Sequence, residues 1–430
     1  MELFPSGKNH SDNKTVPKLI LPLFLTVVVL AAFPLYYTFN RAPTVHELDL
    51  FLSTSPDGGT GPEPSRNSKA AAPAAEIARR CDISTGDWVP DPTAAPSYSN
   101  ETCWEIQETQ NCKKFGQPDN GYLRWRWKPD GCELPVFDPV EFLELVRGKA
   151  LAFVGDSIAR NHMQSLVCLL SRITYPSDIS NTDNRRSLVY RDYDFNITLF
   201  WSPYLVKTGV TYSESNKDNP FDLYLDEFDE SWTTKIKDFD YLIINAGHWF
   251  FRPTRFYLEG KLVGCLYSWD PNVTQLTSGF SYRRALKTAF RAVKSNFKGV
   301  AFLRTFTPQH YENGPWDSGG ECARTEPLRR NDSAALAQFK FDVYDIQREE
   351  FGVAEEEGRR NSDGVVRLRL FDVTQAMLLR PDGHPNRYGH PQNPNITYHN
   401  DCIHWCLPGP IDTWGDFFME LLKREVIDPR

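Results

Sequence analysis

The sequence lacks cysteine before Cys81, lacks an excess of basic residues and lacks the common phosphate-binding and metal-binding signatures. Because phosphate binding needs a basic surface, a formal net charge of −8 argues against a nucleic-acid partner. No Gly-rich phosphate loop, H-E-x-x-H or EF-hand pattern occurs, so we predict neither nucleotide hydrolysis nor a catalytic metal. Internal repeats are absent too. With 430 residues, 40% of them apolar and 13% aromatic, the chain is long enough for one large domain or two.

Charge is also absent from Leu19 to Phe39, a run of mostly apolar residues. At about 1.5 Å per residue this run spans roughly 30 Å, enough for one membrane crossing. Three lysines precede it, which predicts that residues 1–18 are a cytosolic tail and that the rest of the chain is luminal. A cleaved signal peptide is the alternative, but the run is longer than a usual signal core, so we predict an uncleaved anchor at 19–39. Its modest length suits the thinner membranes of the early secretory pathway and points to the Golgi.

Large apolar residues are few in residues 40–80, which are rich in Pro, Gly, Ser and Ala. Such a segment cannot bury enough surface to offset the entropy of ordering it. We therefore predict a disordered luminal stem that holds the rest of the chain clear of the membrane.

All nine cysteines lie beyond the stem. In an oxidising compartment they indicate a disulfide framework, and their odd number leaves one thiol over. A zinc site around Cys402 and Cys406 is the alternative, which the compartment and the absence of paired C-x-x-C elements disfavour. The spacing does not determine the pairs. We predict a stapled, loop-rich N-terminal lobe at 81–135, in which the alternating residues 124–127 either pack on the main domain or line a substrate groove.

Residues 149–172 carry the first sign of chemistry, because an apolar run enters a Gly-Asp-Ser turn and then an amphipathic helix. The pattern predicts a buried strand over Ala150–Val154 and a helix that begins near Ser157. Ser157 then lies at the helix N-terminus, where the dipole and the unpaired N–H groups favour a developing oxyanion, and Gly155 lets the backbone turn. This layout suits acyl transfer. The alternative is that Ser157 only caps the helix.

A second group of candidate residues stands near the C-terminus, where Asp401 and His404 are three positions apart. A serine hydroxyl is a poor nucleophile until a base takes its proton, and an imidazole needs an acceptor on its other nitrogen to fix its tautomer. His404 and Asp401 can supply these two parts. We therefore predict that the two distant segments meet and form a Ser-His-Asp triad.

Strands and helices alternate through a main domain at 136–430. We expect strands at 150–154, 241–245, 299–304 and 365–371, a further element at 193–206, and helices after 157 and at 221–235, 283–297, 341–357 and 411–424. This alternation predicts a mainly parallel sheet covered on both faces, an α/β/α sandwich. Active sites of such sheets lie at the carboxyl ends of the strands, where both Ser157 and residues 245–248 fall.

The two motifs, GDSIARN at 155–161 and DCIHWCLPG at 401–409, resemble those of the plant trichome birefringence-like family of polysaccharide O-acetyltransferases, relatives of the GDSL/SGNH esterases. The stretches FLRTFTPQHYENGPWDSGGEC and QAMLLRPDGHPNRYGHPQNPN agree as well, and the similarity covers roughly residues 81–424. It implies an SGNH-like domain with Ser157 as nucleophile, His404 as base and Asp401 as the carboxylate that orients it. It also implies four disulfides and a free Cys265; the pairs are Cys81–Cys132, Cys103–Cys168, Cys112–Cys406 and Cys322–Cys402.

The resemblance leaves the oxyanion hole unassigned, because the usual Gly-x-Asn-Asp order of SGNH enzymes is not reproduced in the segment NAGHW at 245–249. Two residues one turn beyond Ser157 could also reach the substrate or could belong to the helix surface. The candidates for oxyanion and substrate contacts are Gly155, Asp156, Arg160, Asn161, Asn245, Gly247 and His248.

The expected reaction is a double displacement through an acetyl-serine onto a hydroxyl of a hemicellulose. Stretches such as GHWFFRP favour xyloglucan, with mannan and xylan as alternatives. If water takes the acetyl group, the protein is a carbohydrate acetylesterase, and a non-catalytic wall-polysaccharide binding protein is a hypothesis of another class. We expect no bound cofactor, and the acetyl donor is a co-substrate, either acetyl-CoA or an acetylated membrane protein. N-x-S/T triplets predict glycosylation of some of five positions, Asn100, Asn196, Asn272, Asn331 and Asn395.

Overall fold

The computed structural model describes residues 81–427, apart from 119, 183–184, 210–219, 268–270, 333–335, 337–341, 361–365, 394 and 397. The predicted tail, anchor and stem at 1–80 lie outside the described residues. Within the described ranges, no helix has both the length and the apolar character that a membrane crossing requires.

A seven-stranded sheet in the order β13-β12-β9-β3-β6-β5-β4 forms the centre of the fold. The five strands from β13 to β6 are parallel, and β5 and β4 are added antiparallel at one edge. The strands are β3 (Ala150–Gly155), β4 (Ser177–Asp178), β5 (Arg185–Tyr190), β6 (Phe195–Trp201), β9 (Tyr241–Asn245), β12 (Val300–Arg304) and β13 (Arg367–Phe371). The central strands are apolar along their length because both faces of the sheet are covered.

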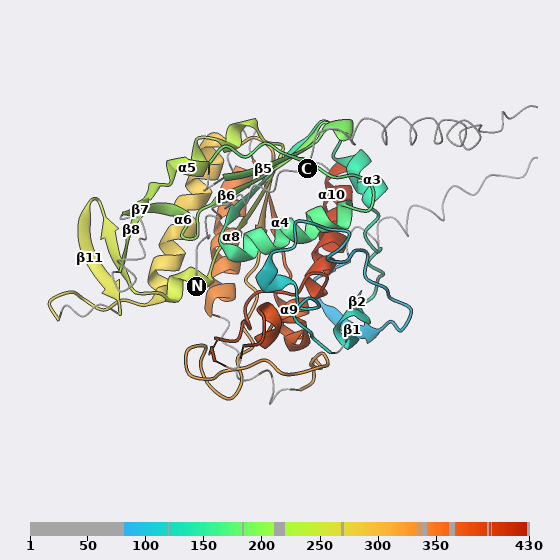
Figure 1. The fold of residues 1–430 in the computed structure, drawn as a ribbon. Helices are drawn as coiled ribbons and strands as arrows, with labels where there is room; N and C mark the ends of the chain where they lie inside the picture. The colour runs from blue at the N-terminus through green and yellow to red at the C-terminus, as the bar shows by residue number, and fades with distance from the viewer. Residues whose placement is uncertain are drawn as a thin grey trace, which may run out of the picture. The chain divides into compact units, whose positions relative to one another are not determined.

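Helices lie on both faces of this sheet (Figure 1). One face packs against α3 (Pro139–Leu145), α4 (Ser157–Leu170) and α10 (Thr413–Ile427), and the other against α6 (Ser278–Asn296) and α8 (Asp342–Arg360). Phe153 of β3 enters the first core and its neighbour Val154 enters the second, since successive strand residues point to opposite faces. The predicted α/β/α sandwich is therefore the observed architecture.

A second sheet of four strands, in the order β11-β10-β8-β7, was not predicted. It consists of β7 (Val206–Gly209), β8 (Phe221–Phe228), β10 (Thr254–Leu258) and β11 (Lys261–Leu266). The helix expected at 221–235 is wrong, because only α5 (Glu230–Thr233) is helical there. In β8, Leu223 and Leu225 are buried while Asp222 and Tyr224 point to the other face, which is the alternation of a strand. The carbonyl of Leu225 accepts a hydrogen bond from Thr288 of α6, which fixes the sheet beside the main domain.

The N-terminal lobe is a hairpin of β1 (Gly86–Pro90) and β2 (Trp125–Pro129) with mostly irregular loops. The Trp127 indole is buried and donates to the carbonyl of Ile83, whereas Arg126 pairs with Glu133 on the outer side. The alternating residues thus pack one face inward.

Buried polar contacts join the lobe to the main domain. The Trp88 indole N–H donates to the carbonyl of Ala376, 2.7 Å away, at α9 (Thr374–Leu378). Arg380 lies over the Trp88 ring, forms a bidentate ion pair with Asp382 and donates to the carbonyl of Tyr122 in the lobe. Because the guanidinium is almost fully buried, these partners supply all the compensation for its loss of water.

The disulfides pair as the resemblance implies: Cys81–Cys132, Cys103–Cys168, Cys112–Cys406 and Cys322–Cys402. Cys265 is free and buried. The bridge from Cys103 joins the lobe to α4, and two bridges hold residues 402 and 406, so the segment with His404 is tied down on both sides.

Candidate active site

Ser157 is the first residue of α4 and follows β3 after a turn of a single residue, Asp156. The Asp156 side chain caps the helix by accepting from the N–H of Ile158, 2.9 Å away. Gly155 has φ of +156°, and a Cβ at that position would lie 1.8 Å from the carbonyl oxygen of Asn245 in β9. Only glycine fits, so the turn that presents Ser157 depends on this residue. Ser157 itself is 6% exposed.

Asp401 and His404 form the second part of the site. Nδ1 of His404 lies 2.8 Å from Oδ2 of Asp401, and Oδ1 accepts from the backbone N–H groups of Ile403 and His404. Burial raises the pKa of Asp401, but the His404 imidazole and these hydrogen bonds outweigh it and hold the pKa well below its usual range. A carboxylate kept ionised in this way fixes the Nδ1–H tautomer of His404 and leaves Nε2 as the basic nitrogen.

Asn161 joins the two segments. It lies one turn beyond Ser157 on α4, its Oδ1 accepts from the N–H of Trp405 at 2.8 Å, and its Nδ2 donates to the Trp405 carbonyl at 3.4 Å. Burial raises the pKa of Asp156, the residue before the serine, and the nearby His404 opposes this rise. The predicted meeting of the two distant segments is therefore observed. Asn161 is fully buried and binds protein backbone, so the structure places it away from the substrate role considered for it.

Nε2 of His404 is buried and, among the described residues, has no hydrogen-bond partner. Active-site hydrogen bonds are often long without substrate and tighten only when the reacting groups are bound. Nε2 of His404 is thus held on a fixed loop, where it can accept a hydrogen bond from a group that reaches it.

Comparison with known proteins agrees with this geometry. Residues 134–421 match PC-Esterase, described as a GDSL/SGNH-like acyl-esterase family found in Pmr5 and Cas1p, and residues 79–133 match the PMR5 N-terminal domain. The chain is 48% identical to protein trichome birefringence-like 19 of Arabidopsis thaliana, over 95% of this chain and 94% of that protein. The chain belongs to the trichome birefringence-like family.

Two further relatives of this trichome birefringence-like protein bear on its function. Protein trichome birefringence-like 20 of Arabidopsis thaliana is 50% identical over 80% of this chain and 72% of that protein. Xyloglucan O-acetyltransferase 3 of Populus trichocarpa is 41% identical over 80% of this chain and 86% of that protein. A likeness to the crystal structure of a small COPII coat GTPase of Encephalitozoon cuniculi has a TM-score of 0.27 at 8% identity, over 68% of this chain and 89% of that one, and carries no argument.

The candidates of the NAGHW segment gather at the same sheet edge as the serine of this family member. Asn245 ends β9 directly beside Gly155, and its Oδ1 is buried without a partner among the described residues. The Gly247 N–H faces the Asp156 carboxylate and lowers its pKa. Burial, the nearby His404 and Arg304 lower the pKa of His248 to about 3, so its imidazole is neutral. Because the unpaired Oδ1 of Asn245 only accepts, the groups that remain candidates to donate to an oxyanion are the side-chain N–H groups of Asn245 and His248.

Arg160 lies on the other side of Ser157. Its guanidinium lies over the ring of Trp201, which ends β6 and stands opposite Gly155 in the sheet register. Trp201 contacts Trp249 edge to face, and Arg252 covers Trp249 at 3.9 Å. Sequence analysis did not single out Trp201, because only the sheet register brings it opposite Gly155, or Arg252, which is linked to this region through Trp249.

Buried charges near the serine balance one another. Burial raises the pKa of Asp156, while Arg304, which is almost fully buried at the end of β12, lowers it. Burial lowers the pKa of Arg304 to about 9, and Asp156 opposes this shift. The guanidinium also donates to the Thr305 carbonyl and lies over the Trp414 ring. Across the described ranges, no group of three or more His, Cys, Asp or Glu side chains could hold a metal ion.

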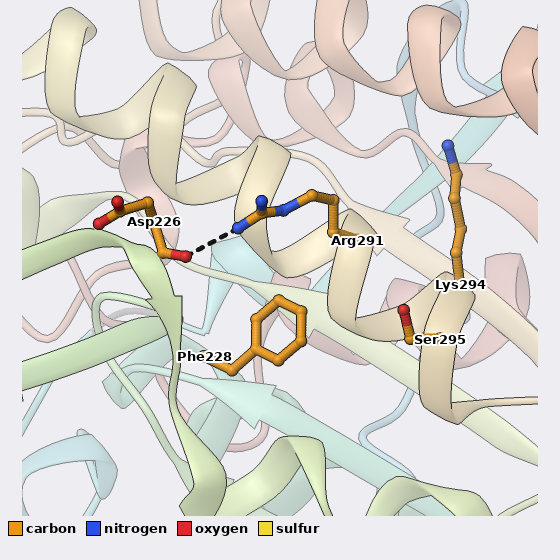
Figure 2. Close-up of a pocket in the computed structure, with 5 residues that line it drawn as sticks. All are labelled: Asp226, Phe228, Arg291, Lys294 and Ser295. Carbon is orange, nitrogen blue, oxygen red and sulfur yellow. Dashed lines mark hydrogen bonds between the residues drawn. The ribbon is translucent and has the colours of Figure 1, made fainter. Parts of the chain in front are cut away.

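Two hollows of this trichome birefringence-like protein lie away from Ser157 and His404. Figure 2 shows one of about 350 Å³ between the end of β8 and α6, in which Arg291 donates to the backbone carbonyl of Asp226 and lies beside Phe228. Arg291 lies near the end of α6, just before β12 begins, whereas Ser157 follows the carboxyl end of β3. This hollow therefore lies at the sheet edge opposite Ser157. A second, of about 380 Å³, lies between the lobe and the loop at Leu407 and Pro408.

The predicted glycosylation positions differ in accessibility. Asn196 lies in β6 between β3 and β5, and the threonine of its triplet, Thr198, is buried, so this position lacks the exposed loop that the modification needs. The other four are exposed: Asn100, Asn272, Asn331 and Asn395.

Proposed function

We propose that this protein is a polysaccharide O-acetyltransferase that carries the acetyl group on Ser157. The observation that supports this most directly is the state of His404, whose Nδ1 is bound to Asp401 at 2.8 Å while its Nε2 is buried without a partner in the described part of the chain. An imidazole oriented in this way is a base that lacks only its proton donor. Asn161 holds its loop against the helix that begins with Ser157.

In the first half-reaction, the Ser157 hydroxyl gives its proton to Nε2 of His404 and its oxygen attacks the acetyl carbonyl carbon of the donor. Asp401 stabilises the imidazolium that forms. The oxyanion develops at the N-terminus of α4, where the helix dipole favours negative charge, and Asn245 and His248 are the candidates for additional donors. The bond to the donor's leaving group then breaks, the leaving group takes the proton from His404, and acetyl-Ser157 remains.

In the second half-reaction, a sugar hydroxyl gives its proton to His404 and attacks the carbonyl carbon of acetyl-Ser157. The bond to the serine oxygen breaks, and that oxygen takes back the proton, which restores the free enzyme. The wall formed by Arg160 and Trp201 is the candidate surface for the acceptor, because planar aromatic rings and guanidinium groups suit the apolar faces and hydroxyls of a neutral sugar.

The acceptor we favour is xyloglucan. The support is the name of the Populus relative at 41% identity, xyloglucan O-acetyltransferase 3, whereas the two relatives near 50% identity carry names that state no substrate. The polysaccharide class is therefore better supported than the individual polymer, and mannan and xylan are the alternatives to test. The donor is proposed to be acetyl-CoA or an acetylated membrane protein. We also propose that the run at 19–39 anchors the protein in the Golgi membrane with the catalytic domain in the lumen.

The test is to incubate the purified full-length chain with isotope-labelled acetyl-CoA and one acceptor at a time. The acceptors are oligosaccharides of xyloglucan, mannan and xylan. Mass spectrometry then locates any labelled acetyl group. We expect Ser157→Ala to abolish transfer, because no other nucleophile is available at that position. The matched control is Ser171→Ala, at the far end of the same helix, where the hydroxyl only donates to the Cys168 carbonyl. Transfer that persists in Ser157→Ala would refute the covalent mechanism.

Carbohydrate acetylesterase activity is the second candidate function, because the main domain matches a family described as acyl-esterases. The triad is the same, and only the species that attacks acetyl-Ser157 differs. Release of labelled acetate in the presence of saturating oligosaccharide, with no acetylated sugar formed, would favour hydrolysis over transfer. Binding of polysaccharide without either product would instead support the non-catalytic hypothesis.

A further inference from the structure

Two buried histidines lie behind the loop that bears His404. Nδ1 of His384 lies 2.6 Å from the carbonyl oxygen of His404, and Nε2 of His384 lies 2.7 Å from Nδ1 of His310. Nε2 of His310 in turn lies 2.9 Å from the carbonyl oxygen of Leu378. His310 is 1% exposed and His384 is 2% exposed. The three contacts form a chain from one backbone carbonyl through two imidazoles to another.

If both rings are neutral, the two imidazoles have only two N–H hydrogens for the three contacts. A carbonyl oxygen only accepts, so Nδ1 of His384 and Nε2 of His310 must both carry hydrogen. Each neutral imidazole has a single N–H, so the remaining two nitrogens would face each other as bare lone pairs at 2.7 Å. One additional proton between them turns this repulsive contact into an N–H···N hydrogen bond and satisfies all three contacts.

We propose that His310 and His384 share one proton beyond the two of the neutral rings, and that His384 is a positioning residue that holds the carbonyl of the catalytic base. This extension rests on the proposed role of His404. The His384 ring also stacks on Trp405, with ring centroids 4.1 Å apart, while Asn161 holds the backbone of the same residue. The base is therefore held by Asp401 at its side chain, by His384 at its carbonyl and by Asn161 at the next residue.

The charges around the pair determine when the additional proton is lost. Burial, with smaller contributions from nearby His404 and Arg380, lowers the pKa of His384 to about 4, although the bond to the His404 carbonyl and the Asp401 carboxylate oppose this shift. For His310, burial, the positive charge of His384 and Arg324 lower the pKa, and the bond to the Leu378 carbonyl raises it.

The two arginines are themselves paired, Arg380 with Asp382 and Arg324 with Glu312, which weakens their effect. The pair is therefore cationic and fully hydrogen-bonded only at clearly acidic pH. As the pH rises through about 4, the pair loses the shared proton and one of its three contacts. The position of the His404 carbonyl thus becomes coupled to pH through groups that never touch the substrate.

The spectroscopic test uses proton NMR of the full-length chain across acidic to neutral pH. We expect two resonances far downfield of the amide region, one from the Asp401–His404 hydrogen bond and one from the shared N–H···N proton. Asp401→Asn should remove only the first, and His384→Asn only the second, which should also fade as the pH rises. This readout does not require acetyl transfer, so it remains decisive if the proposed function fails. A spectrum in which His384→Asn removes no resonance at any pH would overturn the shared proton.

The kinetic test measures hydrolysis of a small acetyl ester, which needs Ser157 and His404 whatever the natural acceptor is. His384→Asn keeps an amide N–H for the His404 carbonyl but cannot share a proton, so kcat should stay within about threefold and lose one ionisation from its pH profile. His384→Phe keeps a ring on Trp405 without a donor, and kcat should fall about tenfold with KM nearly unchanged, as expected for one lost hydrogen bond. The matched control is His162→Leu, which removes a buried histidine that contacts the rings of Phe153, Phe371 and Trp414 and whose Nδ1 has no hydrogen-bond partner among the described residues.

Equal kcat in His384→Phe, His162→Leu and the unchanged chain would overturn the positioning role. So would an equal loss in His384→Asn and His384→Phe, because a positioning donor must be rescued by the asparagine. Hydrolysis that survives Ser157→Ala would instead show that the proposed function has failed.

Discussion

Two polar clusters of this protein differ in whether their buried polar atoms have hydrogen-bond partners. At the junction between the lobe and the main domain, Arg380 satisfies Asp382 and the Tyr122 carbonyl, and Asp412 accepts from Tyr98, Ser165 and the Gly409 N–H. At the carboxyl edge of the sheet, polar atoms of Asp156, Asn245, His248 and His404 are buried without partners among the described residues. Satisfied groups stabilise a fold, whereas unsatisfied ones cost stability. Unpaired buried atoms also occur elsewhere in the described residues, as at Gln110 and Gln164, so the distinguishing feature of the sheet edge is that four of them lie around Ser157.

The largest expected effect in this comparison is at the catalytic cluster. Asp401→Asn should reduce kcat by about 10⁴, because the amide can hold His404 in the wrong tautomer. The free energy of unfolding should also fall, because the lowered pKa of Asp401 means that the fold favours its ionised form, although the asparagine oxygen can still accept from the Ile403 and His404 N–H groups. Steady-state kinetics and urea unfolding of the same preparation measure both quantities. A fall in kcat of less than tenfold would refute the orienting role of Asp401.

Two disulfides of similar loop length provide the next comparison. Cys103–Cys168 at the junction and Cys322–Cys402 at the catalytic loop close 65 and 80 residues, and loss of either should cost about 4 kcal/mol of stability. Only replacement of the second pair by alanine should also lower kcat, because residue 402 adjoins the Asp401–His404 hydrogen bond. Urea unfolding and kinetics at 25 °C test this. Equal kcat in the two double variants would contradict a special role for the catalytic loop.

Asp416 is a junction group whose burial makes stability depend on pH. Burial raises the pKa of Asp416 to about 8, above the unfolded value of 3.8, although its hydrogen bond from the Phe137 N–H lowers it. Between these values the folded chain binds more protons, so stability is greatest below about pH 4 with respect to this group and falls as the pH rises through about 8. The slope is at most about 1.4 kcal/mol per pH unit.

Asp416→Asn should remove this slope and be more stable than the unchanged chain at pH 8, with kcat unaltered. Unfolding midpoints measured in urea at several pH values check the expectation. The same decline in both proteins would assign the pH dependence to another group, with Asp412 the first candidate, because burial raises its pKa to about 6.

Asn161 lies beside the catalytic cluster, but its side chain is hydrogen-bonded like the groups at the junction. The smallest effects are expected at this residue. Asn161→Ala removes two hydrogen bonds to Trp405, so it should cost about 1–2 kcal/mol of stability and lower kcat about tenfold. Gln164→Ala on the same helix is the matched control, because its buried side-chain oxygen has no partner among the described residues. If both variants behave alike, Asn161 is only a packing residue.

Sequence reasoning succeeded where local chemistry determines structure. The apolar run, the glycine and the serine at 150–157 specify a strand, a turn and a helix start, and the contact of Gly155 with Asn245 explains why glycine is needed there. The reasoning failed at 221–228, which was expected to be helical although the buried Leu223 and Leu225 recur with the period of two that belongs to a strand. His310 and His384 were not found, because a single histidine carries no signal until the fold brings a second one to it.

The bridge between Cys112 and Cys406 has a consequence for synthesis. Because chains are made from the N-terminus, the serine and its helix emerge early, whereas the imidazole and the last two bridge-forming cysteines arrive near the end of the chain. Under the proposed mechanism, Ser157 therefore lacks its base until the segment with His404 has been made. A translation product truncated before His404 would then lack acyl-transfer activity.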